Sequence, residues 1–357
     1  MTGNSARNGF PRRFLLTGGA GFIGSHVAEA LLARGSRLTI VDSLDSSYSQ
    51  KSKLSNLAEI RRVGNFTLRE ADICNFAQLR ESFEASTPQA VIHLAAKSGV
   101  QSSFDDPLAY GYVNVTGTFH VLELCREFGV ERLVLGSSSS VYGAACPAPF
   151  QEGRFDLQPL SPYAVTKLEA ERLAQDYALA RGLAVVCLRL FSVYGPRMRP
   201  DSAIFKFTHA LDSGNAIQIL GDGSLSRDFT WIGDVVPAIL AALEYSFPAA
   251  LASSNGNGNG YGSAVPFEIF NLGASSPVSL NTLIAVLEKI TRRRAVRQQL
   301  PNQPGEVPTT CADNSKAQKL LGFSATTPLE NGLEQFVAWY RPAQIRPEVS
   351  LARASAD

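Results

Sequence analysis

Two residues near the middle of the chain have the types and the spacing for proton transfer. Tyr163 and Lys167 stand four positions apart in an amphipathic stretch, so a helix would present a phenol and an ammonium group on one face. A tyrosine with its ordinary pKa of about 10 is ionised in only about one molecule in a thousand at pH 7, so it needs nearby positive charge to act as a base. Ser138, in the run Ser137–Ser140, adds a hydroxyl group. Together these residues predict a site that takes a proton from a carbinol.

A glycine-rich segment upstream predicts what accepts the hydride of that carbinol. Gly18, Gly21 and Gly24 lie between a strand expected at Phe14–Thr17 and a helix expected at Phe22–Arg34. Without side chains, the backbone at such a turn can approach a pyrophosphate, which the N-terminus of the helix stabilises. The alternative is a purely structural tight turn. The order of the glycines, the serine run and the Tyr–Lys pair favours a nicotinamide-dependent enzyme.

An acidic residue after the glycines indicates the kind of nicotinamide cofactor. Asp42 ends the next expected strand, at about the 20-residue spacing of the acid that binds the adenosine ribose hydroxyls. A carboxylate there repels a 2′-phosphate, so the sequence favours NAD over NADP, while Lys51 and Lys53 nearby keep NADP open. Asp72, followed by Ile73, is placed either to hold the adenine or to be a simple loop acid.

The elements that must position these residues predict an α/β fold. Apolar runs of strand length alternate with helical runs, which is typical of a Rossmann-type doubly wound parallel sheet. The expected strands are Phe14–Thr17, Arg37–Val41, Ala90–Leu94, Arg132–Leu135 and Ala184–Leu190, and the further helices are Phe76–Ala85, Pro107–Phe128 and Pro162–Arg181. Ligands bind at the carboxyl ends of such strands. We therefore expect one edge of the sheet to collect Thr17, Asp42, Leu94, Ser137–Ser140 and Ser192.

The pattern changes after about residue 195. We expect a cofactor-binding domain over residues 12–195, which includes the catalytic residues, and a smaller mixed α/β C-terminal substrate lobe over 196–341. Helices of that lobe are expected near Ala203–Ser213, Val235–Tyr245 and Leu280–Ile290. Residues 1–11 and 342–357 are expected to be flexible tails, and Ser253–Gly262 has the composition of a flexible loop.

The composition of the chain excludes several classes of function. The 357 residues are 45% hydrophobic and 18% charged, as in an ordinary globular protein. A net charge of +1 without a basic stripe argues against nucleic-acid binding. No apolar run approaches the ~20 residues of a membrane span, and residues 1–11 lack a signal-peptide core, so a cytoplasmic protein is expected. Five scattered cysteines without a Cys-x-x-Cys pair, and four scattered histidines, predict no metal site.

Several motifs together resemble those of the extended short-chain dehydrogenase/reductase family, in its branch of NAD-dependent nucleotide-sugar epimerases and dehydratases. The resemblance extends from about Arg13 to Tyr340. The motifs that carry it are Thr17–Gly24, Asp72-Ile73, His93–Ala96, Asn114–Thr118, Ser137–Gly143, Tyr163–Lys167, Arg227–Phe229 and Phe270–Gly273.

The resemblance implies a role for individual residues. Tyr163 would be the base, Lys167 would lower its pKa and hold the nicotinamide ribose, and Ser138 would complete the catalytic group. The residues implied to bind NAD are Gly18, Gly21, Phe22, Ile23, Gly24, Asp42, Ser43, Asp72, Ile73, Leu94, Ala95, Ala96, Asn114, Tyr163 and Lys167. The residues implied to bind the UDP-sugar are Ser139, Ser140, Ser192, Arg199, Ile219, Leu220, Arg227, Gln303 and Glu306. Of these, Arg227 would meet the diphosphate, Gln303 and Glu306 would lie near the uridine, and Ile219 and Leu220 would pack on the base. A homodimer through Pro107–Phe128 and Pro162–Arg181 is also implied.

Within this family, the segment Leu188–Asp201 is most similar to UDP-glucuronate 4-epimerases, and the glycine-rich insertion before Phe267 supports this. Their carboxylate pocket would correspond to Ser138, Ser139, Ser140, Ser192 and Arg199. Oxidising C4 of a uronic acid creates a β-keto acid, which loses carbon dioxide when its carboxylate can rotate out of the ketone plane. Hydroxyl donors and an arginine would hold that carboxylate and suppress the loss. The resemblance thus implies interconversion of UDP-glucuronate and UDP-galacturonate.

Other activities within and outside the family are alternatives. Gln101 and Lys97 depart from the residues usual in UDP-glucuronate 4-epimerases, which keeps open a 4-epimerase of UDP-glucose or UDP-N-acetylglucosamine. A decarboxylase that makes UDP-xylose, or a dehydratase, would need an acid after the catalytic hydroxyl, where Ser139 and Ser140 stand. A non-catalytic NAD-sensing protein would have no need of the serine, tyrosine and lysine together.

Overall fold

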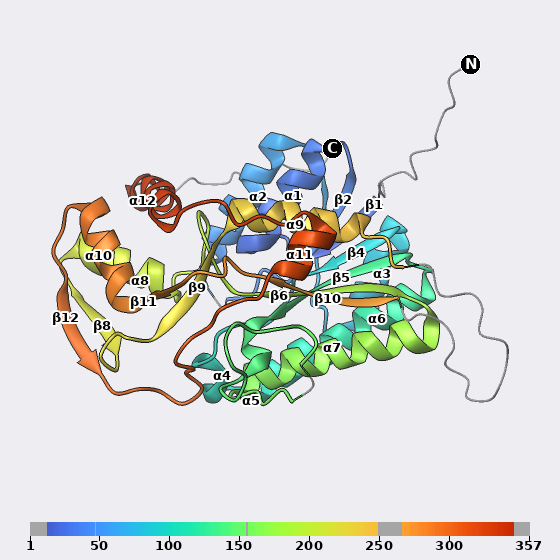
Figure 1. The fold of residues 1–357 in the computed structure, drawn as a ribbon. Helices are drawn as coiled ribbons and strands as arrows, with labels where there is room; N and C mark the ends of the chain where they lie inside the picture. The colour runs from blue at the N-terminus through green and yellow to red at the C-terminus, as the bar shows by residue number, and fades with distance from the viewer. Residues whose placement is uncertain (1–12, 47, 155, 249–265, 346–357) are drawn as a thin grey trace, which may run out of the picture.

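The computed structural model describes residues 13–46, 48–154, 156–248 and 266–345. The expected tail at 1–11, the expected loop at Ser253–Gly262 and all but the start of the expected tail at 342–357 lie outside these residues. Figure 1 shows a large sheet with helices on both faces, and beside it a smaller group of strands and helices.

The large sheet consists of seven parallel strands in the order β10-β6-β5-β4-β1-β2-β3. The bounds are β1 Arg13–Thr17, β2 Arg37–Asp42, β3 Thr67–Glu70, β4 Ala90–His93, β5 Arg132–Ser138, β6 Ala184–Leu190 and β10 Phe267–Leu272. The predicted Rossmann-type doubly wound fold is confirmed. The strand order reverses between β1 and β4, and ligands bind at such a reversal, outside the carboxyl ends of the strands.

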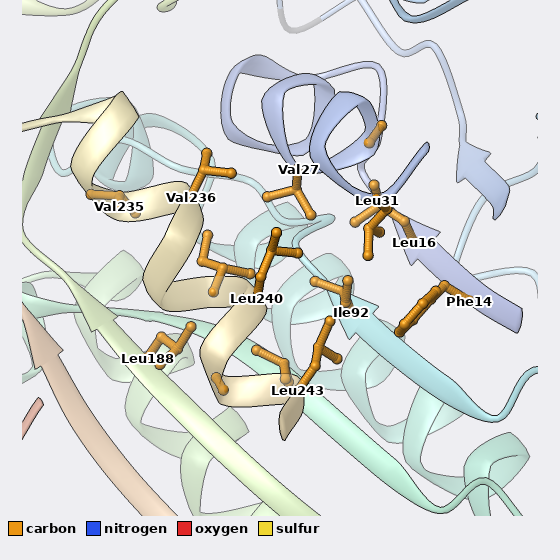
Figure 2. Close-up of a cluster of buried hydrophobic side chains, with 14 of the residues drawn as sticks. Phe14, Leu16, Val27, Leu31, Ile92, Leu188, Val235, Val236, Leu240 and Leu243 are labelled. Atoms are coloured by element: carbon orange, nitrogen blue, oxygen red, sulfur yellow. The ribbon is translucent and has the colours of Figure 1, made fainter. Parts of the chain in front are cut away.

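Helices cover both faces of this sheet (Figure 1). One face carries α1 Phe22–Ala33, α2 Gln50–Val63 and α9 Ile232–Glu244, and the other carries α3 Phe76–Ser86, α6 Gly117–Glu127 and α7 Pro162–Arg181. The side chains of β1 divide between two cores. Figure 2 shows Phe14 and Leu16 packed with Val27 of α1 and Leu240 of α9, whereas Leu15 belongs to the core on the opposite face. A strand covered on both faces is therefore apolar throughout.

Helix α7 has clear signals at both ends. Ser161 caps its start, where the hydroxyl accepts a hydrogen bond of 3.1 Å from the backbone N–H of Ala164, and Pro162 occupies the first turn. Gly182 ends the helix with φ 71°, a left-handed conformation that glycine adopts easily. The predicted bounds of this helix are confirmed, and they place the proton-transfer pair on its first two turns.

The helix expected over Pro107–Phe128 is not uniform. The structure has α4 Ser102–Asp105, then α5 Pro107–Gly111, a π-helical turn η1 Tyr112–Thr116 and α6 Gly117–Glu127. A π-helical turn carries one residue more than an α-helical turn and occurs often at functional sites. Here it contains the buried Asn114, whose amide bonds to Thr166 of α7.

The smaller part has its own short sheets and core. Its elements are β7 Ser192–Tyr194, α8 Ala203–Ser213, β8 Ala216–Leu220, β9 Ser226–Trp231, β11 Pro277–Ser279, α10 Leu280–Thr291, β12 Val296–Leu300 and α12 Leu329–Ile345. The three helices expected after residue 195 are present. Three elements beyond that residue, β10, α9 and α11 Ser315–Leu321, nevertheless belong to the large sheet and its core. The chain therefore crosses between the two parts more than once, and α12 extends past the expected start of the tail at residue 342.

Candidate active site

The glycine turn lies against the end of β4. Gly18 has φ 73°, and a Cβ built there would lie 2.7 Å from the backbone nitrogen of Ala95. The hydroxyl of Thr17 lies 2.7 Å from Nδ1 of His93 and accepts a hydrogen bond of 3.2 Å from the N–H of Ala95. Burial lowers the pKa of His93 to about 3, so the ring is neutral. The turn between β1 and α1 therefore packs tightly against the end of β4, and uncharged hydrogen bonds among buried groups connect the two.

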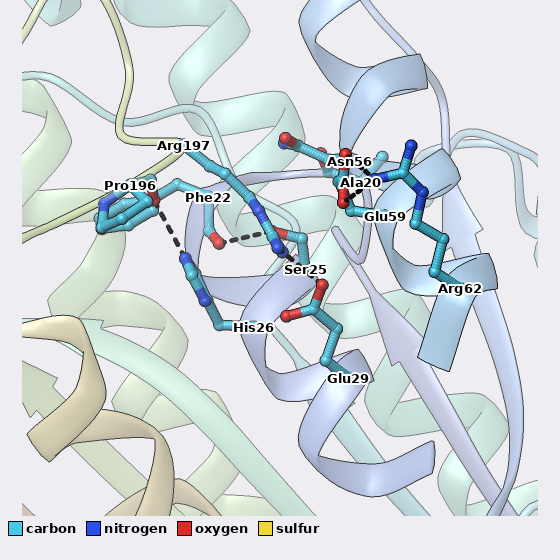
Figure 3. Close-up of polar contacts among 10 residues, drawn as sticks. All are labelled: Ala20, Phe22, Ser25, His26, Glu29, Asn56, Glu59, Arg62, Pro196 and Arg197. Carbon is cyan, nitrogen blue, oxygen red and sulfur yellow. Dashed lines mark hydrogen bonds and ion pairs between the residues drawn. The ribbon is translucent and has the colours of Figure 1, made fainter. Parts of the chain in front are cut away.

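Asp42 faces this turn. One of its oxygens accepts a hydrogen bond of 3.0 Å from the N–H of Ala20, the other accepts one of 3.0 Å from Leu44, and Nζ of Lys53 lies 3.9 Å away. Burial raises the pKa of Asp42, and the hydrogen bond from Leu44 and the charge of Lys53 oppose that rise. The side-chain amide of Asn56 donates a hydrogen bond to the carbonyl of Ala20 (Figure 3). The acid is therefore fixed at the place where a ribose acid is expected.

One further polar group supports a dinucleotide at this edge. The hydroxyl of Tyr48 is buried and has no hydrogen-bond partner among the residues that the structure describes. It points toward Gly21, where a Cβ would lie 3.8 Å from it. A buried hydroxyl normally has a partner. The bare glycine turn, the fixed acid and this hydroxyl together fit a pyrophosphate and ribose.

The other predicted cofactor residues differ in exposure. Phe22, Ile23 and Leu94–Ala96 are half-buried, Ser43 and Asp72 are exposed, and Ile73 is buried. Asp72 accepts a hydrogen bond of 2.8 Å from the N–H of Cys74, as a loop acid does. Asn114 accepts a bond from the N–H of Lys97 (2.8 Å) and donates to its carbonyl (2.9 Å), so it fixes the loop after β4.

The three predicted catalytic residues come together at the carboxyl end of β5. Ser138 ends that strand, and its hydroxyl lies near enough to Tyr163, on the first turn of α7, to lower the pKa of the phenol. The ring of Tyr110 packs on that of Tyr163 with a centroid distance of 6.2 Å. Nζ of Lys167 donates a hydrogen bond of 2.6 Å to the carbonyl of Gly136, two residues before Ser138.

Burial determines the charge state of this group. It raises the pKa of Tyr163, and the interaction with Ser138 and the charge of Arg199 only partly oppose the rise. The role of Lys167 in lowering this pKa stays a prediction. Burial also lowers the pKa of Lys167 itself to about 8, against the opposing charge of Glu171.

A pocket opens at the start of α7, between the segment after β5 and the C-terminal loops. Its lining includes five of the predicted substrate residues, namely Ser139, Ser140, Ser192, Arg227 and Glu306. Ser161 and Ala164, which lie on either side of Tyr163 in the sequence, line it as well, together with Val100, Gly143, Phe150, Leu160, Gly305, Val307 and Thr310. The hydroxyl-rich end of β5 and the C-terminal loops therefore share one cavity.

Arg199 lies outside that lining. It donates to the hydroxyl and, at 2.9 Å, to the carbonyl of Ser98, and it lies 3.2 Å from the carboxylate of Asp201. The segment before Arg199 contacts helix α1 at two points, both drawn in Figure 3. Nε2 of His26 lies 3.0 Å from the carbonyl oxygen of Pro196, and Arg197 forms an ion pair with Glu29. The charge of Arg199 still acts on Tyr163.

Arg227 and Glu306 bind one another across the pocket. The guanidinium of Arg227 also donates a hydrogen bond of 2.8 Å to the carbonyl of Val307, and Gln101 donates one of 3.0 Å to the carboxylate of Glu306. Gln101 belongs to the large sheet's loops and Glu306 to the C-terminal loops. This chain of contacts therefore connects the two parts of the molecule at the mouth of the pocket.

Besides Arg199, three other predicted substrate residues lie outside the lining of the pocket. Ile219 is only 5% exposed and belongs to the core of the smaller part, so its side chain does not lie free to pack on a base. Leu220 is half-buried at the end of β8, and Gln303 is exposed. The alternation of β8 explains the correction for Ile219, because neighbouring side chains of a strand point to opposite faces.

Some residues of the site were missed from the sequence. Tyr48, Ser98 and Tyr110 contact it, and none has a spacing signal that could have revealed it. Glu171 is different, because it follows Lys167 by four residues and the signal was visible. Its buried ion pair with Arg189, at 2.7 Å, lies directly behind the catalytic strand end.

Comparison with known proteins agrees with this geometry. A family model described as GDP-mannose 4,6 dehydratase matches residues 15–336. A UDP-glucuronate 4-epimerase of Thermodesulfobacterium geofontis is 40% identical over 327 residues, which cover 91% of this chain and 95% of the relative. UDP-glucuronate 4-epimerase 2 of Arabidopsis thaliana is 39% identical, with coverage of 91% and 75%.

Solved structures show the same similarity. A UDP-glucuronic acid 4-epimerase from Bacillus cereus, in complex with UDP-glucuronic acid and NAD, superposes with a TM-score of 0.83 at 33% identity, covering 92% of this chain and 99% of that one. A UDP-glucose 4-epimerase from Thermotoga maritima, with UDP-glucose, gives 0.82 at 30% identity, with coverage of 93% and 99%. The chain therefore belongs to the GDP-mannose 4,6-dehydratase family, within the extended short-chain dehydrogenases/reductases.

Proposed function

We propose that this protein is an NAD-dependent epimerase that inverts C4 of a UDP-hexose and interconverts UDP-glucuronate and UDP-galacturonate. One observation carries the proposal: the start of α7, which carries Tyr163, lines the serine-rich pocket through Ser161 and Ala164, at the carboxyl edge of the sheet. The similarity to epimerases that are described as acting on, or bound to, UDP-glucuronic acid supports this choice of sugar.

The residues at the sheet edge fit NAD. The glycine turn would meet the pyrophosphate, Asp42 would accept hydrogen bonds from the adenosine ribose, and the free hydroxyl of Tyr48 would gain a partner. When bound, NAD supplies the nicotinamide that takes up and returns the C4 hydride, and its positive ring favours ionised Tyr163. Lys167 would bind the nicotinamide ribose, as the family resemblance implies.

The catalytic residues handle the proton on O4. In the proposed reaction Tyr163 takes this proton while the hydride leaves C4, and Ser138 donates a hydrogen bond to the same oxygen. The resulting 4-keto sugar turns about its diphosphate and presents its other face. The hydride then returns to C4, and Tyr163 gives the proton back to O4. The pocket must therefore bind the nucleotide firmly and leave the hexose room to rotate.

The serine hydroxyls are proposed to hold the sugar carboxylate. Ser139, Ser140 and Ser192 line one pocket, and each can donate one hydrogen bond. Holding the carboxylate in the plane of the C4 ketone slows loss of carbon dioxide. Arg199 is engaged with Ser98 and Asp201, so its contribution is the positive field that it adds near Tyr163.

At the mouth of the pocket, the nucleotide diphosphate is proposed to bind Arg227. That side chain is paired with Glu306 in the structure, so the diphosphate would replace a carboxylate as its partner. Arginine forms two parallel hydrogen bonds to phosphate as readily as to carboxylate. Glu306 and Gln303 are then free to meet the uridine.

Incubation of the purified protein with UDP-glucuronate, followed by proton NMR, tests the proposal. We expect UDP-galacturonate to form without added cofactor and without carbon dioxide, because NAD is regenerated in each turnover. Denaturing the protein should release NAD in a ratio near one per chain. Formation of UDP-xylose or a 4-keto pentose would contradict the proposed hold on the carboxylate.

A neutral-sugar epimerase is the second candidate. The specific observation in its favour is that Asp201 holds Arg199 away from the pocket lining, and the chain is nearly as similar to the Thermotoga maritima UDP-glucose 4-epimerase. Turnover of UDP-glucose with none of UDP-glucuronate would establish this candidate instead.

We also propose a homodimer through the helices α5, η1, α6 and α7. Large apolar side chains are exposed along these helices, namely Leu108 (85%), Tyr112 (56%), Phe119 (42%), Val165 (43%) and Leu179 (47%). Exposed apolar side chains gathered on neighbouring helices are typical of a binding surface. Light scattering after gel filtration should give twice the chain mass of 38.4 kDa, and a monomer would contradict this proposal.

The location proposed for the protein is the cytoplasm. All five cysteines are free thiols, as is usual in a reducing compartment. Among the helices of the described residues, none has the length and apolar character needed to cross a bilayer. Fractionation of cells that express the protein would test the location.

A further inference from the structure

Three residues of α7 follow one another at intervals of four positions and end at a partner on β6. Tyr163, Lys167 and Glu171 lie on one face of the helix, because residues at this spacing are neighbours on its surface. Lys167 is 7% exposed and Glu171 is 3% exposed. The guanidinium of Arg189 on β6 donates two hydrogen bonds to Glu171, of 3.0 and 2.7 Å. Once the phenol is ionised, the row alternates in charge from the first residue to the last.

The carboxylate of Glu171 also holds the strand that carries the catalytic serine. The hydroxyl of Ser137 donates to it, and Ser137 precedes Ser138 at the end of β5. In the register of the two strands, Ser137 lies opposite Arg189. One buried carboxylate therefore connects the helix that positions Tyr163 with both strands behind the site.

Fold stability alone does not account for this ion pair. Apolar residues of similar volume are often as stabilising as a buried pair, because two charges must be removed from water. The pair here is not fully satisfied, since Nη1 of Arg189 has no hydrogen-bond partner among the described residues, and the guanidinium carbon lies 4.7 Å from the ring centroid of Tyr142. A buried donor without a hydrogen-bond partner destabilises the fold. Such a pair is explained better by an electrostatic task at the neighbouring site.

We propose that Glu171 is a positioning residue, whose buried negative charge one helical turn from Lys167 keeps that ammonium group charged so that Tyr163 can act as the base. The inference rests on the proposed function of Tyr163 and Lys167. Glu171 contacts neither the substrate nor the reacting atoms in this scheme, and acts through Lys167 and Ser137.

The charges around Lys167 determine the sign of the expected effect. Burial lowers the pKa of Lys167 to about 8, and the charge of Glu171 is the largest cause that raises it. Other titratable groups face the same region from neighbouring strands and from the segment after β5, and they are neutral near pH 7. Burial lowers the pKa of His93 on β4 to about 3, and raises those of Tyr142 to about 12 and of Cys187 on β6 well above its usual value.

Replacing Glu171 with glutamine keeps the size of the side chain and removes its charge. The pKa of Lys167 should then fall below 8, so that the ammonium is lost in the neutral range. Because the proposed reaction needs charged Lys167, the alkaline limb of its pH–rate profile should move to lower pH by about one unit, the size of shift that a nearby charge produces.

The experiment compares Glu171→Gln with Glu171→Asp and Glu169→Gln. Lysines are labelled at Cε with ¹³C and titrated by NMR, and the signal of Lys167 is assigned by its absence in Lys167→Met. The chain contains eight lysines, so the signals can be separated. The pH profile of UDP-glucuronate turnover is measured on the same samples.

We expect both the NMR titration and the alkaline limb to move by about one unit in Glu171→Gln, as expected for a lost neighbouring charge. Glu171→Asp keeps the charge and should restore the wild-type limb even if its rate is lower. Glu169→Gln changes an exposed glutamate on the same helix, paired with Arg172, and should leave both readouts unchanged. A lower rate with an unmoved limb and an unmoved NMR titration would overturn the proposal, since a merely structural role predicts that result.

The test remains decisive if the wild-type protein is inactive or if Glu171→Gln does not fold. If wild-type protein does not turn over UDP-glucuronate, the proposed function fails, whereas the NMR titration still decides whether Glu171 holds the charge of Lys167. If Glu171→Gln does not fold, the double variant Glu171→Gln/Arg189→Gln removes the buried pair as two amides that can bond to each other. This variant removes one negative and one positive charge near Lys167, so it is compared with the single variant Arg189→Gln, which removes only the positive charge and should raise the pKa of Lys167. The NMR titration and the alkaline limb should lie at lower pH in the double variant than in Arg189→Gln. A pKa of Lys167 as high in the double variant as in Arg189→Gln would overturn the proposal.

Discussion

The two sides of the active site are built in different ways. On the cofactor side, Asp42 and Thr17 are bonded to backbone groups of the glycine turn and of the loop after β4, and a Cβ at Gly18 would collide with the neighbouring backbone. On the substrate side, the charged groups are bonded to each other, as Arg227 is to Glu306 and Arg199 is to Asp201. The first side is formed before any ligand arrives, while the second must exchange partners when an anionic ligand binds. Changes on the two sides should therefore have different signs and sizes.

The largest effect is expected at Tyr163, where the two sides meet. Tyr163→Phe removes the only group proposed to take the O4 proton, and general bases of this kind contribute about 10²–10⁴-fold in rate. We expect kcat for UDP-glucuronate to fall by about 10³-fold or more, with KM and melting temperature little changed. Tyr112→Phe on the exposed surface of η1 is the control. Turnover within tenfold of the wild type would exclude Tyr163 as the base.

The next largest effect is expected for alanine substitution at Gly18, on the cofactor side. Comparison with Gly35 distinguishes a steric clash of the added Cβ from strain in the backbone. Gly18 and Gly35 have nearly the same conformation, with φ of 73° and 76°. A Cβ at Gly18 would lie 2.7 Å from the nitrogen of Ala95, whereas one at Gly35 meets nothing within 4 Å. Gly18→Ala should abolish NAD retention and lower the melting temperature strongly. Gly35→Ala should cost about 1–2 kcal/mol in unfolding free energy through strain alone, and keep NAD.

Measurement of released NAD and of urea unfolding on both variants checks this prediction. Equal losses in the two variants would show that strain, and not the contact with the end of β4, explains the need for glycine at this turn.

The same contrast explains what the sequence could predict. The glycine turn, Asp42 and the ends of β1 and β4 are local or nearly local features, with spacings fixed by a strand, a turn and a helix, so their positions were predicted correctly. The helix bounds Pro162–Arg181 were predicted correctly too, because serine, proline and glycine mark both ends. Ser139 and Ser140 were predicted from their place in the motif Ser137–Gly143, and both line the pocket.

The substrate side depends on contacts between distant segments, which no local spacing reveals. Gln101 and Glu306 are 205 residues apart in sequence and lie 3.0 Å apart in the structure. The inward orientation of Ile219 depends on the register of β8 against β12 and on the core beneath it. The rise in the pKa of Tyr163 likewise depends on burial, which three residues in a motif do not reveal.

A smaller effect should appear in the pH dependence of stability on the cofactor side. His93 is buried between Thr17 and Thr118, and its pKa in the fold is about 3, against about 6.5 in the unfolded chain. Between these two values the unfolded chain binds a proton on His93 and the folded protein does not. The free energy of unfolding is therefore unaffected by this group above pH 6.5 and decreases as the pH falls toward 3. At pH 5 the loss should be about 2 kcal/mol.

Urea unfolding at pH 7 and pH 5 measures this loss. His93→Gln keeps a donor and an acceptor but cannot be charged in this range, so its stability should fall less between the two pH values. An equal fall in both proteins would mean that the buried ring does not titrate as the structure indicates.

The smallest predicted effect tests whether the substrate side exchanges partners. Arg227 and Glu306 are each 18% exposed in their side chains, and pairs near the surface contribute up to about 1 kcal/mol. Glu306→Gln frees Arg227 for a diphosphate, so calorimetry should show UDP binding tightened by about threefold to tenfold when NAD is retained. Arg227→Gln should weaken UDP binding by at least as much. The two substitutions neutralise opposite partners of one ion pair. If the intact pair forms the UDP site, both substitutions should weaken UDP binding. If UDP replaces Glu306 as the partner of Arg227, the first substitution should strengthen UDP binding and the second should weaken it.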